Sequence, residues 1–159
     1  MTNTELVLET EDDPRLTNRD RRYMEFVRRH AIDVEPIRSA KLAALVTVKG
    51  TPISIGRNSL RSHPFQAKYS RNEWSIYLHA EINAIYNCLN HLDKDDFKKA
   101  TLYIARVKKP HNRSREWADG CACPCEGCMR AITEFDFRKI VYTTDVTNKY
   151  EILERKDLA

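Results

Sequence analysis

Two short motifs place metal-binding side chains at two distant points of this 159-residue chain. The first, Leu78 to Ile85 (L-H-A-E-I-N-A-I), opens an amphipathic stretch with a histidine and, two residues later, a glutamate. The second, Cys123 to Cys128 (C-P-C-E-G-C), carries two cysteines at C-x-x-C spacing directly after a proline. A fold that uses both motifs must bring them together around one metal ion.

His79, Cys125 and Cys128 would supply one imidazole and two thiolates, which are three ligands for a tetrahedral Zn²⁺. The fourth corner then stays open for water, as it does in catalytic zinc sites and not in structural ones. Glu81 is too close to His79 in sequence to be a comfortable fourth ligand, but its carboxylate can reach that water and move its proton. We therefore interpret the two motifs as one hydrolytic zinc site.

A purely structural zinc is the main alternative, although it would leave Glu81 without a role and would need a fourth ligand from the chain. Cys121 and Cys123 could complete such a site, bind a second structural zinc with His63 or His111, or be small buried hydrophobic residues. A closed site would make the chain a non-catalytic zinc-binding module for contact with protein or nucleic acid.

The length predicts a single zinc-binding domain over residues 16–159, preceded by an acidic and flexible arm at residues 1–15. Four of the five cysteines fall within residues 121–128, a distribution that favours metal ligation over a disulfide framework. The chain has neither a G-x-G-x-x-G motif nor a P-loop, which excludes the usual cradles for dinucleotides and ATP.

No apolar run approaches the ~20 residues that a membrane-spanning helix needs, and the first residues do not form a basic-then-apolar signal. We therefore expect no membrane partner and a cytoplasmic location, which would be the host cytoplasm if the chain is viral.

Hydrophobic periodicity predicts a mixture of helices and strands in alternation. Helices are expected at about 17–30, at 79–92 and from Pro124 onwards, and strands at 41–49, 52–56, 101–107, 139–143 and 150–153. The first two strands form a hairpin, and the polar segments 58–75 and 108–123 are expected to be long loops. Only residues 144–149 separate the last two strands, which is too short for a parallel crossover, so these strands should pair antiparallel.

The two motifs together resemble the zinc signature of the cytidine-deaminase-like superfamily, in which H-x-E is followed by P-C-x-x-C. The similarity covers about residues 40–145, is strongest at 79–85, 124–128 and 139–142, and is most like the deoxycytidylate deaminases and their viral relatives. It implies a three-layer α/β/α fold with a mixed central sheet of four to five strands. It also implies Zn²⁺ as the cofactor.

The resemblance implies hydrolytic deamination of a cytosine nucleotide, with deoxycytidine monophosphate (dCMP) as the best single substrate. A zinc-held hydroxide would attack C4, and Glu81 would carry the proton of the water to the ring nitrogen and then to the leaving amine. The backbone N–H of Ala80 would hold the pyrimidine carbonyl, and Asn58 would contact the sugar.

The sequence restricts the identity of the substrate less than it restricts the identity of the metal ion. Arg57, Arg61 and His63 precede the H-x-E motif and are candidates for binding a phosphate. The basic segment 106–115 and Trp117 motivate an alternative in which the base belongs to single-stranded DNA or RNA. A free nucleoside and a purine are further alternatives, since the same zinc signature serves both. Relatives of this kind commonly assemble, so a homo-oligomer is expected by analogy.

Overall fold

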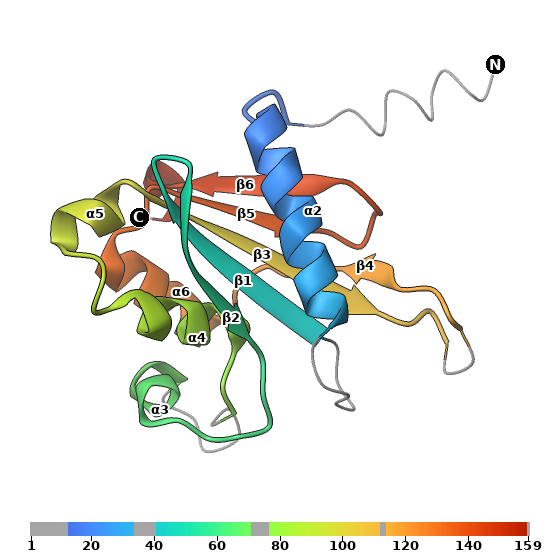
Figure 1. Cartoon of the computed structure of the whole chain (residues 1–159), viewed down its shortest axis with the longest axis horizontal. Helices are drawn as coiled ribbons and strands as arrows, with labels where there is room; N and C mark the ends of the chain where they lie inside the picture. Colours follow the sequence, from blue (N-terminus) through green and yellow to red (C-terminus); the bar gives the residue numbers. More distant parts are fainter. Residues whose placement is uncertain (1–12, 34–40, 71–76, 112–113, 159) are drawn as a thin grey trace.

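A mixed sheet lies at the centre of the fold, with one helix on one face and several helices on the other (Figure 1). The computed structural model describes residues 13–33, 41–70, 77–111 and 114–158, so residues 1–12 of the predicted acidic arm lie outside it. The three layers agree with the expected architecture. The sheet has six strands in the described residues, more than the four to five expected.

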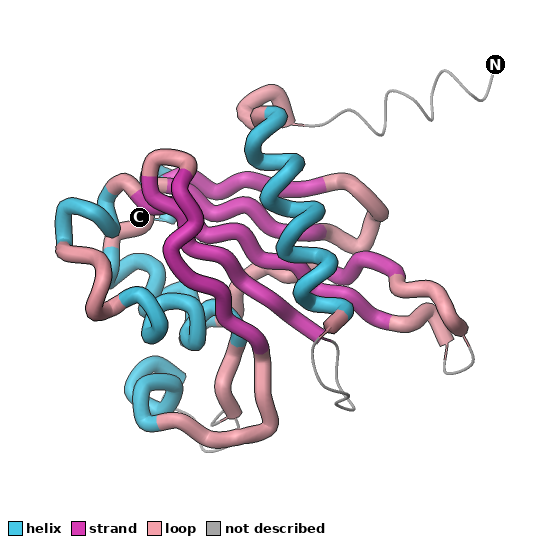
Figure 2. Tube along the Cα trace, viewed as in Figure 1, coloured by secondary structure: helices cyan, strands magenta, loops and turns pink. Residues whose placement is uncertain are grey.

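The strand order is β2-β1-β3-β5-β6, and β4 pairs with the end of β3 off this path (Figure 2). The strands are β1 (Lys41–Val48), β2 (Thr51–Arg57), β3 (Ala100–Lys108), β4 (Ala118–Gly120), β5 (Lys139–Thr143) and β6 (Tyr150–Glu154). The pair β3–β5 is parallel and the other pairs are antiparallel. The β1–β2 hairpin and the antiparallel β5–β6 pair confirm two expectations from the sequence.

The helices are α2 (Asn18–Ile32), α3 (Pro64–Ser70), α4 (Ala80–Cys88), α5 (Lys94–Lys98) and α6 (Glu126–Phe135), followed by the 3-10 helix η1 (Arg155–Leu158). Thr17 caps α2, because its side chain accepts a hydrogen bond from the backbone N–H of Asp20. The segment 58–75 was expected to be a loop, and it contains α3. The helix expected to reach Leu92 ends at Cys88.

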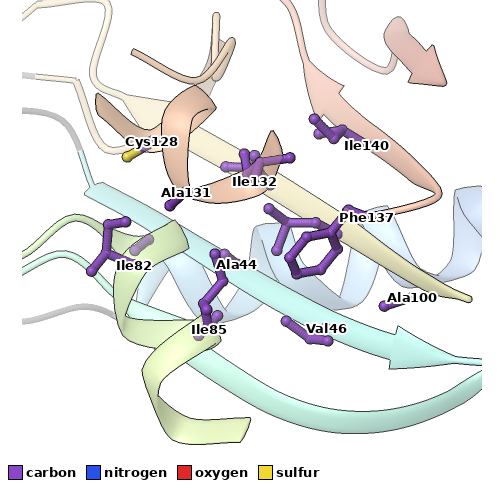
Figure 3. Close-up of a cluster of buried hydrophobic side chains, with 14 of the residues drawn as sticks. Ala44, Val46, Ile82, Ile85, Ala100, Cys128, Ala131, Ile132, Phe137 and Ile140 are labelled. Atoms are coloured by element: carbon purple, nitrogen blue, oxygen red, sulfur yellow. The ribbon is translucent and has the colours of Figure 1, made fainter. Parts of the chain in front are cut away.

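Each face of the sheet has its own hydrophobic core. Met24 and Val27 of α2 pack with residues such as Leu45 on one face. On the other face, α4 and α6 contribute Ile82 and Ile132 to a larger cluster (Figure 3). Because β1 and β3 are covered on both sides, their sequences are continuous apolar runs and not alternating ones.

A buried polar network ties α2 to the sheet. The Asp20 carboxylate accepts hydrogen bonds from the Tyr103 hydroxyl at 2.7 Å and from the Lys139 ammonium at 3.0 Å. Burial opposes the charge of Asp20, but the hydrogen bonds from Thr17, Tyr103 and Lys139 lower the pKa of its carboxyl below the ordinary value. None of the helices in the described ranges is long and apolar enough to cross a membrane.

Gly56 is where β2 lies directly against the first turn of α4. A Cβ at this position would lie 2.2 Å from the backbone nitrogen of Ala84 and 2.3 Å from the carbonyl oxygen of Ala80. We expect Gly56→Ala to lower the free energy of unfolding by about 3 kcal/mol, because neither backbone atom can move away without displacing the helix. Urea denaturation measures this loss, and metal content shows whether α4 has shifted.

Gly50→Ala is the matched comparison. Gly50 has a φ of +79°, and the nearest atoms to an added Cβ belong to the end of the flexible Arg19 side chain. That substitution should cost only about 1 kcal/mol, from backbone strain. Equal losses for the two variants would contradict the close approach of β2 to α4.

Candidate metal centre

The two motifs begin two helices that start at neighbouring points on the same face of the sheet. His79 is the N-cap residue of α4, and Cys125 is the N-cap residue of α6. The Cys125 sulfur accepts a hydrogen bond from the backbone N–H of Cys128 at 3.4 Å. Both N-termini were predicted from sequence. The partial positive charge at the start of a helix favours thiolates in this position.

The three predicted ligands converge. The Nδ1 atom of His79 lies 3.3 Å from the sulfur of Cys128 and 3.5 Å from that of Cys125, and the ligand atoms of all three residues lie within 4.8 Å of one another. Ligands about 2.0–2.3 Å from a tetrahedral zinc are separated by roughly 3.5 Å, so the spacing fits this ion. One imidazole and two sulfurs are also donors that zinc prefers.

No fourth histidine, cysteine or carboxylate joins this cluster, and no second cluster of three such residues exists, within the described part of the chain. The suggestion of a second three-ligand site built from Cys121 and Cys123 with His63 or His111 therefore finds no support in the geometry. Cys121 and Cys123 are exposed, so the idea that they are buried small hydrophobic residues is wrong. Cys88, by contrast, lies in the core.

The two cysteine sulfurs affect each other's ionisation. The hydrogen bond with Cys128 lowers the pKa of the Cys125 thiol to about 3, and the same contact raises the pKa of Cys128 above its ordinary value. The hydrogen bond to Cys125 also raises the pKa of His79. A metal ion would take the place of these protons, because only the thiolate and the neutral imidazole are ligands.

Glu81 is buried beside the cluster in the first turn of α4, with 4% of its surface exposed. Burial raises the pKa of its carboxyl above the ordinary value. Its Oε1 atom has no hydrogen-bond partner among the described residues. A buried carboxylate oxygen without a partner is uncommon and points to a ligand or a water in front of it.

A cavity of about 320 Å³ opens in front of Glu81, at the lower end of the ~300–1,000 Å³ range of small-molecule sites. His79, Glu81 and Cys125 line it. Asn58 and Ala80, two of the predicted substrate contacts, line it as well. The side-chain oxygen of Asn58 accepts a hydrogen bond from the backbone N–H of Leu42, which holds the amide at the cavity wall.

The three basic residues predicted to contact substrate do not line this cavity. Arg57 lies near α2, where its guanidinium is 3.0 Å from Nδ1 of His30. The ring of His63 packs edge-on against Tyr86, and Arg61 is exposed in the segment that follows β2.

Two residues at the site were not among the individual site residues predicted from sequence, although Arg106 belongs to the basic segment 106–115 named there. The side-chain oxygen of the fully buried Gln66 in α3 accepts a hydrogen bond from the backbone N–H of His79 at 2.9 Å and so fixes the start of α4. No periodicity marked this segment. Arg106 lines the cavity, and its alternation with Leu102 and Ile104 along β3 was a signal that could have placed it on this face.

Comparison with known proteins gives a family and a fold. The model of the cytidine and deoxycytidylate deaminase zinc-binding region matches residues 17–144. A cytidine deaminase from Burkholderia pseudomallei has a TM-score of 0.59 at 13% identity, over 86% of this chain and 94% of that chain. A dCMP deaminase from the cyanophage S-TIM5, in apo form, has a TM-score of 0.50 at 22% identity, over 77% of this chain and 80% of that chain. No curated protein sequence matches the chain.

Proposed function

Because this chain belongs to the cytidine and deoxycytidylate deaminase family and is therefore a zinc-dependent deaminase, we propose that its substrate is a cytosine mononucleotide, with dCMP the best match. The reaction would convert dCMP and water into dUMP and ammonia. The observation that carries the proposal is a cavity of single-ligand size lined by Glu81 and by two of the three metal-binding residues, His79 and Cys125, in which the buried Glu81 Oε1 has no hydrogen-bond partner among the described residues. The H-A-E-I-N-A-I motif, most like that of deoxycytidylate deaminases, supports the choice of dCMP.

His79, Cys125 and Cys128 would hold the zinc ion, which when bound can lower the pKa of a water molecule to about 7. The Oε1 atom of Glu81 would accept the proton of that water. Glu81 would then deliver this proton to the ring nitrogen, and it would pass a second proton, taken from the hydroxyl added at C4, to the departing amine. Burial suits Glu81 to this exchange because it raises the pKa of the carboxyl and so favours uptake of a proton.

The remaining contacts would orient the nucleotide. The N–H of Ala80 belongs to the first residue of α4, where a helix offers no internal acceptor, and it would donate to the pyrimidine carbonyl. Asn58, which also lines the cavity, would contact the sugar. The homo-oligomeric state and the cytoplasmic location expected from sequence stay predictions.

One observation favours a second candidate, a base within single-stranded nucleic acid. Leu60 and Tyr77 line the cavity and are 58% and 49% exposed. An exposed aromatic ring at a cavity mouth can stack on a neighbouring base. Binding of this kind would weaken steeply with salt, because it depends on contacts to several phosphates.

A substrate panel tests the two candidates. The zinc-loaded protein is given dCMP, dCTP, deoxycytidine, cytidine, dGMP, dAMP and a short single-stranded oligonucleotide, and ammonia release is measured at two salt concentrations. We expect the highest kcat/KM for dCMP, with a weak salt dependence. Turnover of the oligonucleotide alone, with a steep salt dependence, would support the second candidate and reject the first.

A further inference from the structure

Arg106 reaches the cavity from the end of the central strand. It pairs with Leu42 of β1 on one side and with Gly120 of β4 on the other, and its backbone N–H donates to the Thr143 hydroxyl at 3.0 Å. The stem of the side chain passes over Gly120, where an added Cβ would lie 3.2 Å from both Cγ and Cδ of the arginine. The backbone around Arg106 is therefore fixed on both sides, and Gly120 leaves room for the side chain.

The guanidinium of Arg106 is poorly satisfied. Its Nε is buried and has no hydrogen-bond partner in the described part of the chain, and Nη1 donates to the carbonyl oxygen of Cys121 at 3.4 Å. Arg106 makes no ion pair with a described carboxylate. Asp145 lies close enough to Arg106 for their charges to interact. Its carboxylate, however, accepts hydrogen bonds from the ammonium of Lys108 at 3.2 Å and from the backbone N–H of Cys121 at 3.1 Å.

A largely buried guanidinium without a carboxylate partner costs free energy, and an anion in the adjacent cavity would recover part of it. Among the described residues that line the cavity, Arg106 is the single lysine or arginine. A guanidinium presents its donors as a planar fork, and this shape matches the oxygens of a phosphate. An uncharged nucleoside has no anionic group to match it.

We propose that Arg106 binds the phosphate of the nucleotide in this cavity and is the residue that makes the site prefer a nucleotide over its nucleoside. The proposal deepens the proposed function and rests on it for the site at which the nucleotide binds. It places the phosphate contact on the β3–β4 hairpin, away from Arg57, Arg61 and His63, which lie outside the cavity.

The test compares the binding of dUMP with that of deoxyuridine, neither of which can be deaminated. Titration calorimetry is carried out on the zinc-loaded wild type and on Arg106→Gln, Arg106→Lys and Arg138→Gln, the last changing an exposed arginine before β5. The wild type should bind dUMP about 10- to 100-fold more tightly than deoxyuridine. In Arg106→Gln the two affinities should become nearly equal through loss of dUMP binding, while Arg106→Lys keeps part of the preference and Arg138→Gln keeps all of it.

The same titrations with dGMP and dAMP, each against its nucleoside, separate this proposal from the proposed function. If dCMP is not deaminated but another nucleotide shows a preference that Arg106→Gln abolishes, the function falls and the role of Arg106 stands. An unchanged dUMP preference in Arg106→Gln would overturn the role of Arg106 and leave dCMP deamination intact. A wild type that binds no nucleotide more tightly than its nucleoside would also overturn it. Arg106→Lys, which keeps the charge, provides the answer if the glutamine variant does not fold.

Discussion

Replacing Glu81 by glutamine is expected to lower kcat for deamination by ~10²- to 10⁴-fold while zinc remains bound. Glutamine has nearly the same shape, so the cavity and the three metal ligands stay in place, but an amide cannot accept and return a proton. Ammonia release gives kcat, and metal analysis gives the zinc content. The melting temperature should stay equal or rise, since the variant no longer has a carboxylate held in a buried position with an unpartnered oxygen.

Glu134→Gln is the matched control for this prediction. Glu134 lies on the exposed side of α6, 56% exposed and 3.8 Å from the ammonium of Lys68. A surface pair of this kind contributes ~1 kcal/mol or less, so both activity and stability should be unchanged. Wild-type turnover by Glu81→Gln would reject the proton-transfer role of Glu81.

Cys128→Ala is expected to remove zinc and with it all deamination. Cys128 is fully buried at the start of α6, and its sulfur is one of the three atoms that converge on the metal position. Losing a residue that only supports a ligand already weakens metal binding by ~10- to 100-fold, and losing the ligand itself should weaken it more. Zinc content after gel filtration and a competition titration with a chromogenic chelator measure the effect.

Cys88→Ala provides a closely matched control, because Cys88 is also a fully buried cysteine on the same face of the sheet. Its thiol donates to the carbonyl oxygen of Ile85 at 3.2 Å and has no part in the metal cluster. The variant should lose about 1 kcal/mol of stability and keep its zinc. If Cys128→Ala retained zinc as well as Cys88→Ala does, the metal centre described above would be wrong.

The metal centre could be predicted from sequence because its chemistry is local. Each motif holds its ligands within one helical turn, so the helix start fixes their relative positions before tertiary packing is known. The three-layer architecture was implied by the resemblance of the two motifs to a known superfamily, whereas link length alone restricted the pairing of the last two strands. The short link between β5 and β6 predicted that these two strands pair antiparallel, and the structure confirms it.

The walls of the cavity could not be predicted in the same way, because they are built by segments whose path depends on tertiary contacts. The insertion at 108–123 folds back as β4 on the end of β3, which brings Cys121 next to Arg106. Gln66 lies in a segment without periodicity, and its role becomes visible only through its hydrogen bond to His79. Basic residues near a motif in sequence, such as Arg57, proved a poor guide to which charges face the cavity.

The convergence of α4 and α6 has a consequence for how long the chain survives. His79 and Cys128 are 49 positions apart, and the segment between them carries the central strand β3. A metal ion bound to both residues closes a long loop, as a covalent cross-link would. The ion also binds the folded chain in preference to the unfolded one. The melting temperature should therefore rise with the free zinc concentration. In a cell short of zinc, active sites without metal would be inactive. In addition, part of the protein itself would be lost through unfolding and proteolysis.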